Sequence, residues 1–219
     1  MKDYKIFVIS IDENRQKKYT DPRYTIFQGV NGKEELDIDW INKNYHFYWN
    51  AGNKIKYSIA GCSQSHIKCM ENIRDNKINN AIIIEDDALL DLNRLEELDE
   101  INDFCYIGGR FVDFKNINKI IDKNKIRDKL NEGINKIDEK TFNILNFHGY
   151  YIPKYELVDK LLIKQYTKRR AIDVEFKLQQ RRKKITEFIY PAFSILHLSD
   201  AKNGFTYSSY KLDDNLYRY

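Results

Sequence analysis

Short apolar runs rich in β-branched and aromatic residues recur along the chain, and polar segments separate them. Runs of this kind, bounded by turn signals, are typical of buried strands. They predict strands at 4–10, 24–30, 81–85, 104–109 and 185–193, and a strand that leads into a turn within 141–153. The strand at 104–109 is expected to end in a glycine turn, and His148 and Gly149 are expected to begin the turn that follows the next strand.

The segments between these runs repeat their apolar residues at helical spacing. In 58–76, Ile59, Cys62, His66 and Ile73 fall on one stripe, which predicts an amphipathic helix. Similar patterns predict helices at 91–101, 154–166 and 172–184, with a short helix in 12–19. Asp91 is expected to cap the helix that follows it. Residues 33–57 are rich in aromatic side chains and give no clear pattern.

Strands that alternate with helices indicate an α/β protein. The run Ile82–Ile84 has no polar alternation, so both of its faces are expected to be covered. We therefore predict a Rossmann-like, open mixed sheet flanked by helices. A chain of 219 residues suits one domain spanning 1–219, and we expect the charged, irregular stretch 113–140 to be an exposed insertion.

Composition narrows the classes of protein. Net charge is only +4, which does not indicate a nucleic-acid partner. No window has the apolar length of a membrane span, and the N-terminus runs into a strand without a signal peptide. Cys62, Cys69 and Cys105 are odd in number and form no CxxC pair, so we expect reduced thiols in the core of a cytoplasmic protein.

The strand at 81–85 leads directly into the carboxylates Glu85, Asp86 and Asp87. In an open α/β sheet, ligands bind beyond the carboxyl ends of the strands. Neighbouring carboxylates repel one another, and a hard divalent cation such as Mg²⁺ or Mn²⁺ removes that cost. Such a cation can neutralise a diphosphate leaving group. The alternative is a solvated loop in which one Asp caps a helix.

The order of several motifs resembles glycosyltransferase family 25, which includes lipooligosaccharide and procollagen galactosyltransferases. Most distinctive is a GCxxSH helix that precedes a hydrophobic strand ending in Glu-Asp-Asp. One departure is Ile59, where the family usually has Glu. The resemblance extends from about residue 4 to about residue 198, and its segments are IFVISIDENRQKK, FQGVNG, GCSQSHIKCMENI, AIIIEDDALL, FCYIGG, HGYYIPKYELVDKLL and RRAIDVEF.

This resemblance implies a GT-A fold and an inverting hexosyltransferase that moves galactose or glucose from a UDP-sugar to a glycan, a lipooligosaccharide or a hydroxylated protein. It implies Mn²⁺ or Mg²⁺ as cofactor, held by Asp87, Glu85 and a late histidine, His197. The side chains implied for the nucleotide-sugar are Arg15, Ser65, His66, Glu85, Asp86, Gly149 and Tyr150. Among these, Gly149 would permit close backbone approach and Tyr150 would stack on a sugar.

Inversion requires a base that faces the acceptor hydroxyl. Asp173 is the first candidate and Glu175 the second, while the alternative for Asp173 is a helix N-cap. For His66 the alternative is a hydrogen-bonded core residue.

Two other functions compete with the transferase. A metal-dependent phosphodiester hydrolase would also use an acidic cluster, and a catalytically inactive carbohydrate-binding relative would keep only the fold. The aromatic segment Trp40–Trp49 is expected to be core or an acceptor-site lid, with peripheral contact to a membrane carrying a lipid-linked acceptor as the alternative.

Overall fold

The computed structural model describes residues 2–47, 51–113, 130–137, 142–162, 167–182, 184–190 and 194–196. Seven strands in these ranges form one sheet, in the order β2-β1-β3-β7-β5-β8-β6. Two further strands, β4 and β9, pair in a small second sheet. The strands are β1 Lys5–Ser10, β2 Tyr24–Gln28, β3 Ala81–Glu85, β4 Ala88–Leu90, β5 Cys105–Asp113, β6 Gly133–Lys136, β7 Phe142–Ile152, β8 Glu187–Tyr190 and β9 Ser194–Leu196.

The large sheet is mixed, which confirms the predicted architecture. Strand β1 runs parallel to both β2 and β3, whereas β7 lies antiparallel to β3 and to β5. Strand β8 is parallel to β5, and β6 closes that edge in antiparallel orientation. The carboxyl ends of β1 and β3 therefore open at the same edge of the sheet, where the chain turns into α1 and into the acidic residues.

Two predicted glycine turns are wrong, because the glycines lie inside long strands. Strand β5 continues past Gly109 to Asp113, and shifts of register on either side of Gly108 show a bulge there. Gly109 has φ +148°, a conformation that favours glycine and lets the extra residue fit within a strand. His148 and Gly149 likewise lie within β7, where Gly149 pairs with Ile84 and Gly108.

The helices are mostly those that the periodicity predicts. They are α1 Glu13–Gln16, α2 Gly32–Glu35, α3 Ile38–Asn44, α4 Asn53–Asp75, α6 Leu157–Leu162 and α7 Ile172–Arg181, with a 3₁₀ helix, η1, at Leu92–Leu98. Helix α4 begins five residues before the predicted start. Asp91 caps η1 as predicted, by accepting a hydrogen bond from the backbone of Asn93 at 3.1 Å.

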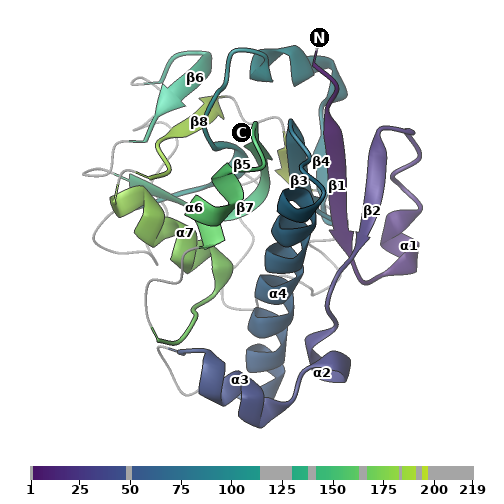
Figure 1. Ribbon diagram of the computed structural model, residues 1–219, viewed down its shortest axis with the longest axis vertical. Coiled ribbons are helices and arrows are strands. Elements are labelled where there is room, and N and C mark those ends of the chain that lie inside the picture. Colours follow the sequence, from purple (N-terminus) through teal and green to yellow (C-terminus); the bar gives the residue numbers. More distant parts are fainter. Residues whose placement is uncertain are drawn as a thin grey trace.

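Both faces of the central strands are covered. Helices α4, α6 and α7 pack on one face, and α4 runs along the sheet in the foreground of Figure 1. Ile83 belongs to this core, while its neighbours Ile82 and Ile84 belong to the core on the other face with residues of η1 and β4. The unbroken apolar run of β3 is thus explained, since every side chain from Ala81 to Ile84 is buried.

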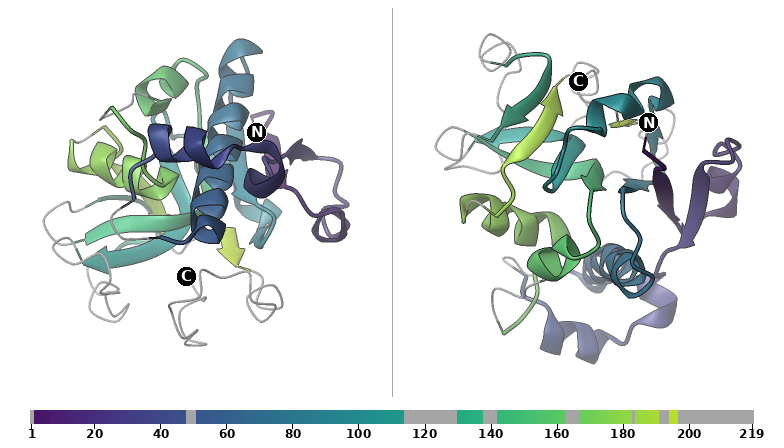
Figure 2. Two further views of the ribbon diagram at one scale, coloured as in Figure 1. Left: turned by 90° about the horizontal axis from the view of Figure 1, so that it is seen from below. Right: turned by 45° about the horizontal axis from the view of Figure 1, so that its top comes forward.

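Part of the expected insertion belongs to the sheet. Gly133–Lys136 forms β6 at the sheet edge, paired with β8 (Figure 2), while 114–129 and 138–140 lie outside the described residues. In the aromatic segment, Ile41 and Tyr45 pack against α4, whereas Trp40 is 40% exposed. Residues 48–50 lie outside the described ranges.

All three cysteines are free, and Cys69 and Cys105 are buried as expected. Cys62 is only half-buried and lies beside the acidic residues. Among the described helices, none combines the length and the apolar character needed to cross a bilayer.

Candidate active site

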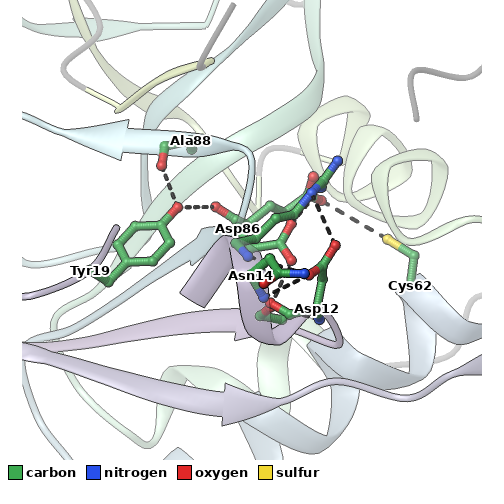
Figure 3. Close-up of polar contacts among 9 residues, drawn as sticks. Asp12, Asn14, Tyr19, Cys62, Asp86 and Ala88 are labelled. Atoms are coloured by element: carbon green, nitrogen blue, oxygen red, sulfur yellow. Dashed lines mark hydrogen bonds and ion pairs between the residues drawn. The ribbon is translucent and has the colours of Figure 1, made fainter. Parts of the chain in front are cut away.

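The three carboxylates stand where β3 ends and the chain turns back into β4. Asp86 and Asp87 form the turn itself, so no helix follows the acidic triplet directly. The hydroxyl of Tyr19 lies 2.5 Å from the carbonyl oxygen of Ala88 and 3.3 Å from that of Glu85. Figure 3 shows Tyr19 reaching the turn from the side opposite Cys62. The turn is thus held at both ends by one buried side chain.

Asp86 ties this turn to the turn after β1. One of its oxygens accepts a hydrogen bond from the Ser10 hydroxyl at 2.7 Å, and the other contacts Arg15 Nη1 at 2.8 Å. Asp12 caps α1 beside them, accepting hydrogen bonds from the backbone of Asn14 and Arg15 (Figure 3). Arg15 therefore lies beside the acidic turn, where its charge is shared with Asp86.

Asp87 is the least satisfied member of the triplet. Its Oδ1 is buried and has no hydrogen-bond partner among the described residues. Burial, together with the charges of Glu85 and Asp86, raises the pKa of Asp87 to about 7, although Arg15 and Lys18 act in the opposite direction. A carboxylate in this state is a good ligand for a cation, because coordination would relieve both desolvation and repulsion.

Glu85 faces helix α4. Its Oε1 lies 3.2 Å from His66 Nε2 and 4.0 Å from Cys62 Sγ. Burial acts to raise the pKa of Glu85, but the His66 hydrogen bond and the nearby His148 and Arg15 outweigh it, so the pKa is lowered. The Glu85 side chain remains 33% exposed, so it is open to a ligand.

His66 is buried and linked on both sides. Its Nδ1 lies 2.9 Å from the Tyr150 hydroxyl, and its Nε2 faces Glu85. It is therefore a hydrogen-bonded core histidine, the alternative interpretation given above, and it also lies directly behind the acidic cluster. Cys62 and His66 are one helical turn apart, so they present their side chains to Glu85 from the same face of α4.

The neighbouring face of α4 explains the rest of the GCxxSH motif. A Cβ on Gly61 would lie 2.8 Å from the backbone of both Gly32 and Val30, so only glycine allows this approach. Ser65 donates to the Gly61 carbonyl and accepts from the Val30 amide, both at 2.8 Å. The expectation that Ser65 contacts the nucleotide-sugar is therefore wrong, because its buried hydroxyl is occupied in bracing the 29–32 loop.

The expectation that Tyr150 stacks on a sugar is also wrong. Its side chain is fully buried, packs against Phe104 and Phe176, and contacts His66 through its hydroxyl. The ring is enclosed in the core, so stacking on a sugar is excluded. Gly149, which precedes it, is buried between two strands rather than exposed in a turn.

His148 joins the acidic cluster, which the sequence reasoning missed. Because β7 is antiparallel to β3 with Gly149 opposite Ile84, the next position brings His148 to Glu85. Ligand atoms of Glu85, Asp87 and His148 all lie within 4.8 Å of one another. Two carboxylates and an imidazole suit Mn²⁺ or Mg²⁺, and the orphaned oxygen of Asp87 fits the same reading. His197, the predicted third ligand, lies outside the described residues.

The two base candidates stand in the first turn of α7. Ala171 is the N-cap, so the capping alternative for Asp173 is wrong. Asp173 is half-buried, and its charge, with those of Glu85 and Asp87, adds to burial in raising the pKa of the Cys62 thiol. Glu175 is buried; its Oε1 accepts from the Arg170 amide at 2.9 Å, whereas its Oε2 is buried with no hydrogen-bond partner among the described residues.

Comparisons with known proteins agree with the order of these elements. No curated protein matches the chain. The model of glycosyltransferase family 25 (LPS biosynthesis protein) matches residues 3–176, which include β1, the GCxxSH helix, the acidic turn, β7 and the first turn of α7. With most of its length matched by this model, the chain belongs to glycosyltransferase family 25.

Proposed function

We propose that this glycosyltransferase moves a hexose from a UDP-sugar to a glycan, lipooligosaccharide or hydroxylated protein acceptor, with inversion and with the help of Mn²⁺ or Mg²⁺. The observation that carries the proposal is the Glu85–Asp87–His148 cluster, with its orphaned buried carboxylate oxygen, at the carboxyl end of β3. In an open α/β sheet this is the edge at which ligands bind.

Each part of the cluster has a role in holding the donor. Asp87 and Glu85 would bind the cation together with His148, and Asp86 would keep the turn in place through Ser10 and Arg15. When bound, the cation would act as a Lewis acid on the leaving diphosphate. Arg15, on the same rim, is the side chain best placed to add charge stabilisation to a phosphate.

Asp173 is the proposed base. It lies on α7, an element separate from the β3–β4 turn. The charges of Asp173, and of Glu85 and Asp87 at that turn, all act on the Cys62 thiol, which lies near both elements. A donor on the acidic turn and a base on α7, which contacts α4 through the Ile172 amide and the Ser63 hydroxyl, would let the acceptor hydroxyl lie between them, as an in-line displacement requires. Glu175 is the weaker candidate because its side chain is buried whereas that of Asp173 is half-buried, and a backbone amide occupies one oxygen of each.

A donor screen tests the function. The purified chain is incubated with Mn²⁺ and UDP-Glc, UDP-Gal, UDP-GlcNAc or other nucleotide sugars, and nucleotide release is measured with and without candidate acceptors. We expect release from a UDP-hexose that requires Mn²⁺ and is lost in Asp87→Asn. Full activity of Asp87→Asn would contradict the assignment. Cleavage of labelled DNA under the same conditions would favour the phosphodiester hydrolase, and no binding of UDP with Mn²⁺ would favour the inactive relative.

A further inference from the structure

Glu85 belongs to a second cluster of metal-ligand type, on the helix side of the acidic turn. Ligand atoms of Cys62, His66 and Glu85 all lie within 4.8 Å of one another. This cluster differs in chemistry from the Glu85–Asp87–His148 cluster, called the outer site below, since it offers a thiol, an imidazole and a single carboxylate. The mechanism proposed above uses neither Cys62 nor the Nε2 atom of His66.

The spacing of the three groups suits tetrahedral coordination. Zinc bonds of about 2.0–2.3 Å to nitrogen, oxygen and sulfur place the ligands roughly 3.3–3.8 Å apart. The separations are 3.2 Å between His66 Nε2 and Glu85 Oε1 and 4.0 Å between Cys62 Sγ and the same oxygen. The third separation, between Cys62 Sγ and a ring nitrogen of His66, lies within 4.8 Å, so all three groups are near the spacing that one ion requires.

His66 has the supporting contact that metal-bound histidines use. Such a histidine usually donates its second ring N–H to an oxygen, which fixes the tautomer and aims the free nitrogen at the metal. The Tyr150 hydroxyl stands 2.9 Å from His66 Nδ1 and is itself fully buried among aromatic rings. In the metal-free chain Nε2 donates to Glu85; on metal binding the remaining proton would sit on Nδ1, facing Tyr150, and the Nε2 lone pair would be offered to the ion beside Glu85 and Cys62.

Access and electrostatics also favour a cation here. The Glu85 side chain is 33% exposed and Cys62 is half-buried, so the cluster can be reached from solvent. Glu85, Asp173 and Asp87 all place negative charge around the thiol. A divalent ion would be drawn to this point, and on binding it would displace the thiol proton to solvent.

We propose that Cys62, His66 and Glu85 form a second divalent-cation site that is selective for soft ions, with Zn²⁺ as its natural class of ligand. Thiolate and imidazole ligands favour Zn²⁺, whereas two carboxylates and one imidazole favour Mn²⁺ or Mg²⁺. Glu85 is common to both clusters, so an ion held by Cys62 and His66 takes this carboxylate from the outer site. Zn²⁺ bound at the second site therefore weakens Mn²⁺ binding at the outer site and inhibits the transferase, a consequence that rests on the proposed function.

The binding site itself is tested without any substrate. The reduced chain is titrated with Co²⁺, and the thiolate-to-cobalt charge-transfer absorption is recorded, followed by addition of Zn²⁺. We expect one equivalent of Co²⁺ to give the absorption and Zn²⁺ to abolish it. The absorption should be lost in Cys62→Ala and kept in Cys69→Ala, which makes the same change two turns along the same helix.

Failure of this titration overturns the proposal directly. Absence of the charge-transfer absorption in the wild-type chain would do so, and so would its persistence in Cys62→Ala. A second variant, His66→Asn, guards against misfolding of the first. Provided that circular dichroism shows it folded, it should weaken Zn²⁺ affinity by about tenfold or more, and unchanged affinity would also contradict the site.

Inhibition is a separate measurement. In wild type, micromolar Zn²⁺ should suppress Mn²⁺-supported nucleotide release, and in Cys62→Ala the Zn²⁺ concentration that halves the rate should rise by about tenfold or more. If Co²⁺ binds to Cys62 but no nucleotide sugar is turned over, the proposed function fails while the metal site stands. If turnover is normal and no thiolate–cobalt absorption forms, only the metal site fails.

Discussion

At the scale of single residues, Asp87 is held in a state that opposes stability. Its folded-state pKa of about 7 lies above the ordinary value of 3.8, so the folded chain binds this proton more tightly than the unfolded chain does. The contribution of Asp87 to the free energy of unfolding of the metal-free protein should therefore fall as pH rises from about 4 to about 7. Such a cost is typical of groups kept for binding rather than for packing.

This argument predicts that Asp87→Asn stabilises the metal-free chain. At pH 8 in the presence of a chelator, we expect the variant to gain roughly 1–3 kcal/mol in free energy of unfolding, measured by urea denaturation. The gain should disappear near pH 4, where the wild-type carboxyl is protonated in both states. A pH-independent gain, or a loss at pH 8, would contradict the explanation that the buried, repelled charge of Asp87 lowers stability.

The neighbouring Asp86→Asn provides a matched control of opposite sign. Both oxygens of Asp86 are engaged, by Ser10 and by Arg15, and the Arg15 side chain is only 16% exposed. Removing the negative charge takes away the shortest ion pair of that guanidinium and leaves the longer contact with Asp12 at 3.9 Å, so we expect a loss of about 1–2 kcal/mol at pH 8 in the same denaturation experiment. Equal behaviour of the two variants would show that the two aspartates do not differ as described.

At the scale of elements, helix α4 is positioned by the close contact of two glycines. Gly61→Ala should lower the free energy of unfolding by about 1–3 kcal/mol, measured by urea denaturation, because the added Cβ meets backbone atoms that cannot move away alone. Gly52→Ala, at the N-cap of the same helix, meets nothing within 4 Å and should cost only about 0.5 kcal/mol, from the weaker preference of an N-cap for alanine. A Gly61→Ala variant as stable as wild type would contradict this packing.

The elements were largely predictable because apolar periodicity is a local property of the sequence. Strands β1, β2 and β3, helix α4 and the acidic turn follow from short patterns. The errors lie where distant segments meet. The burial of Tyr150 and the arrival of His148 at Glu85 both depend on the antiparallel register of β7 with β3, which no local pattern specifies. Glycines that make a bulge and glycines that make a turn also look alike in sequence.

At the scale of the whole molecule, the candidate site joins segments far apart in the chain. Arg15, Glu85, His148 and Asp173 come from α1, β3, β7 and α7. A nucleotide and a cation that bind together should therefore stabilise the folded chain as one unit. At a hundredfold excess over Kd the gain is about 2.7 kcal/mol, or roughly 5–10 °C in Tm for a chain of this size. Thermal unfolding should show this shift with UDP and Mn²⁺ together, and a much smaller one with UDP alone.

The same measurement separates the two halves of the site. Asp173 stands on α7 rather than on the metal-binding turn, so Asp173→Asn should keep the stabilisation by UDP and Mn²⁺ while transfer to an acceptor falls by about 10²–10⁴-fold, the usual contribution of a general base. Asp87→Asn should instead lose the nucleotide-dependent shift. If Asp173→Asn lost nucleotide binding as well, Asp173 would belong to the donor-binding part of the site, and the base would have to be sought on another element.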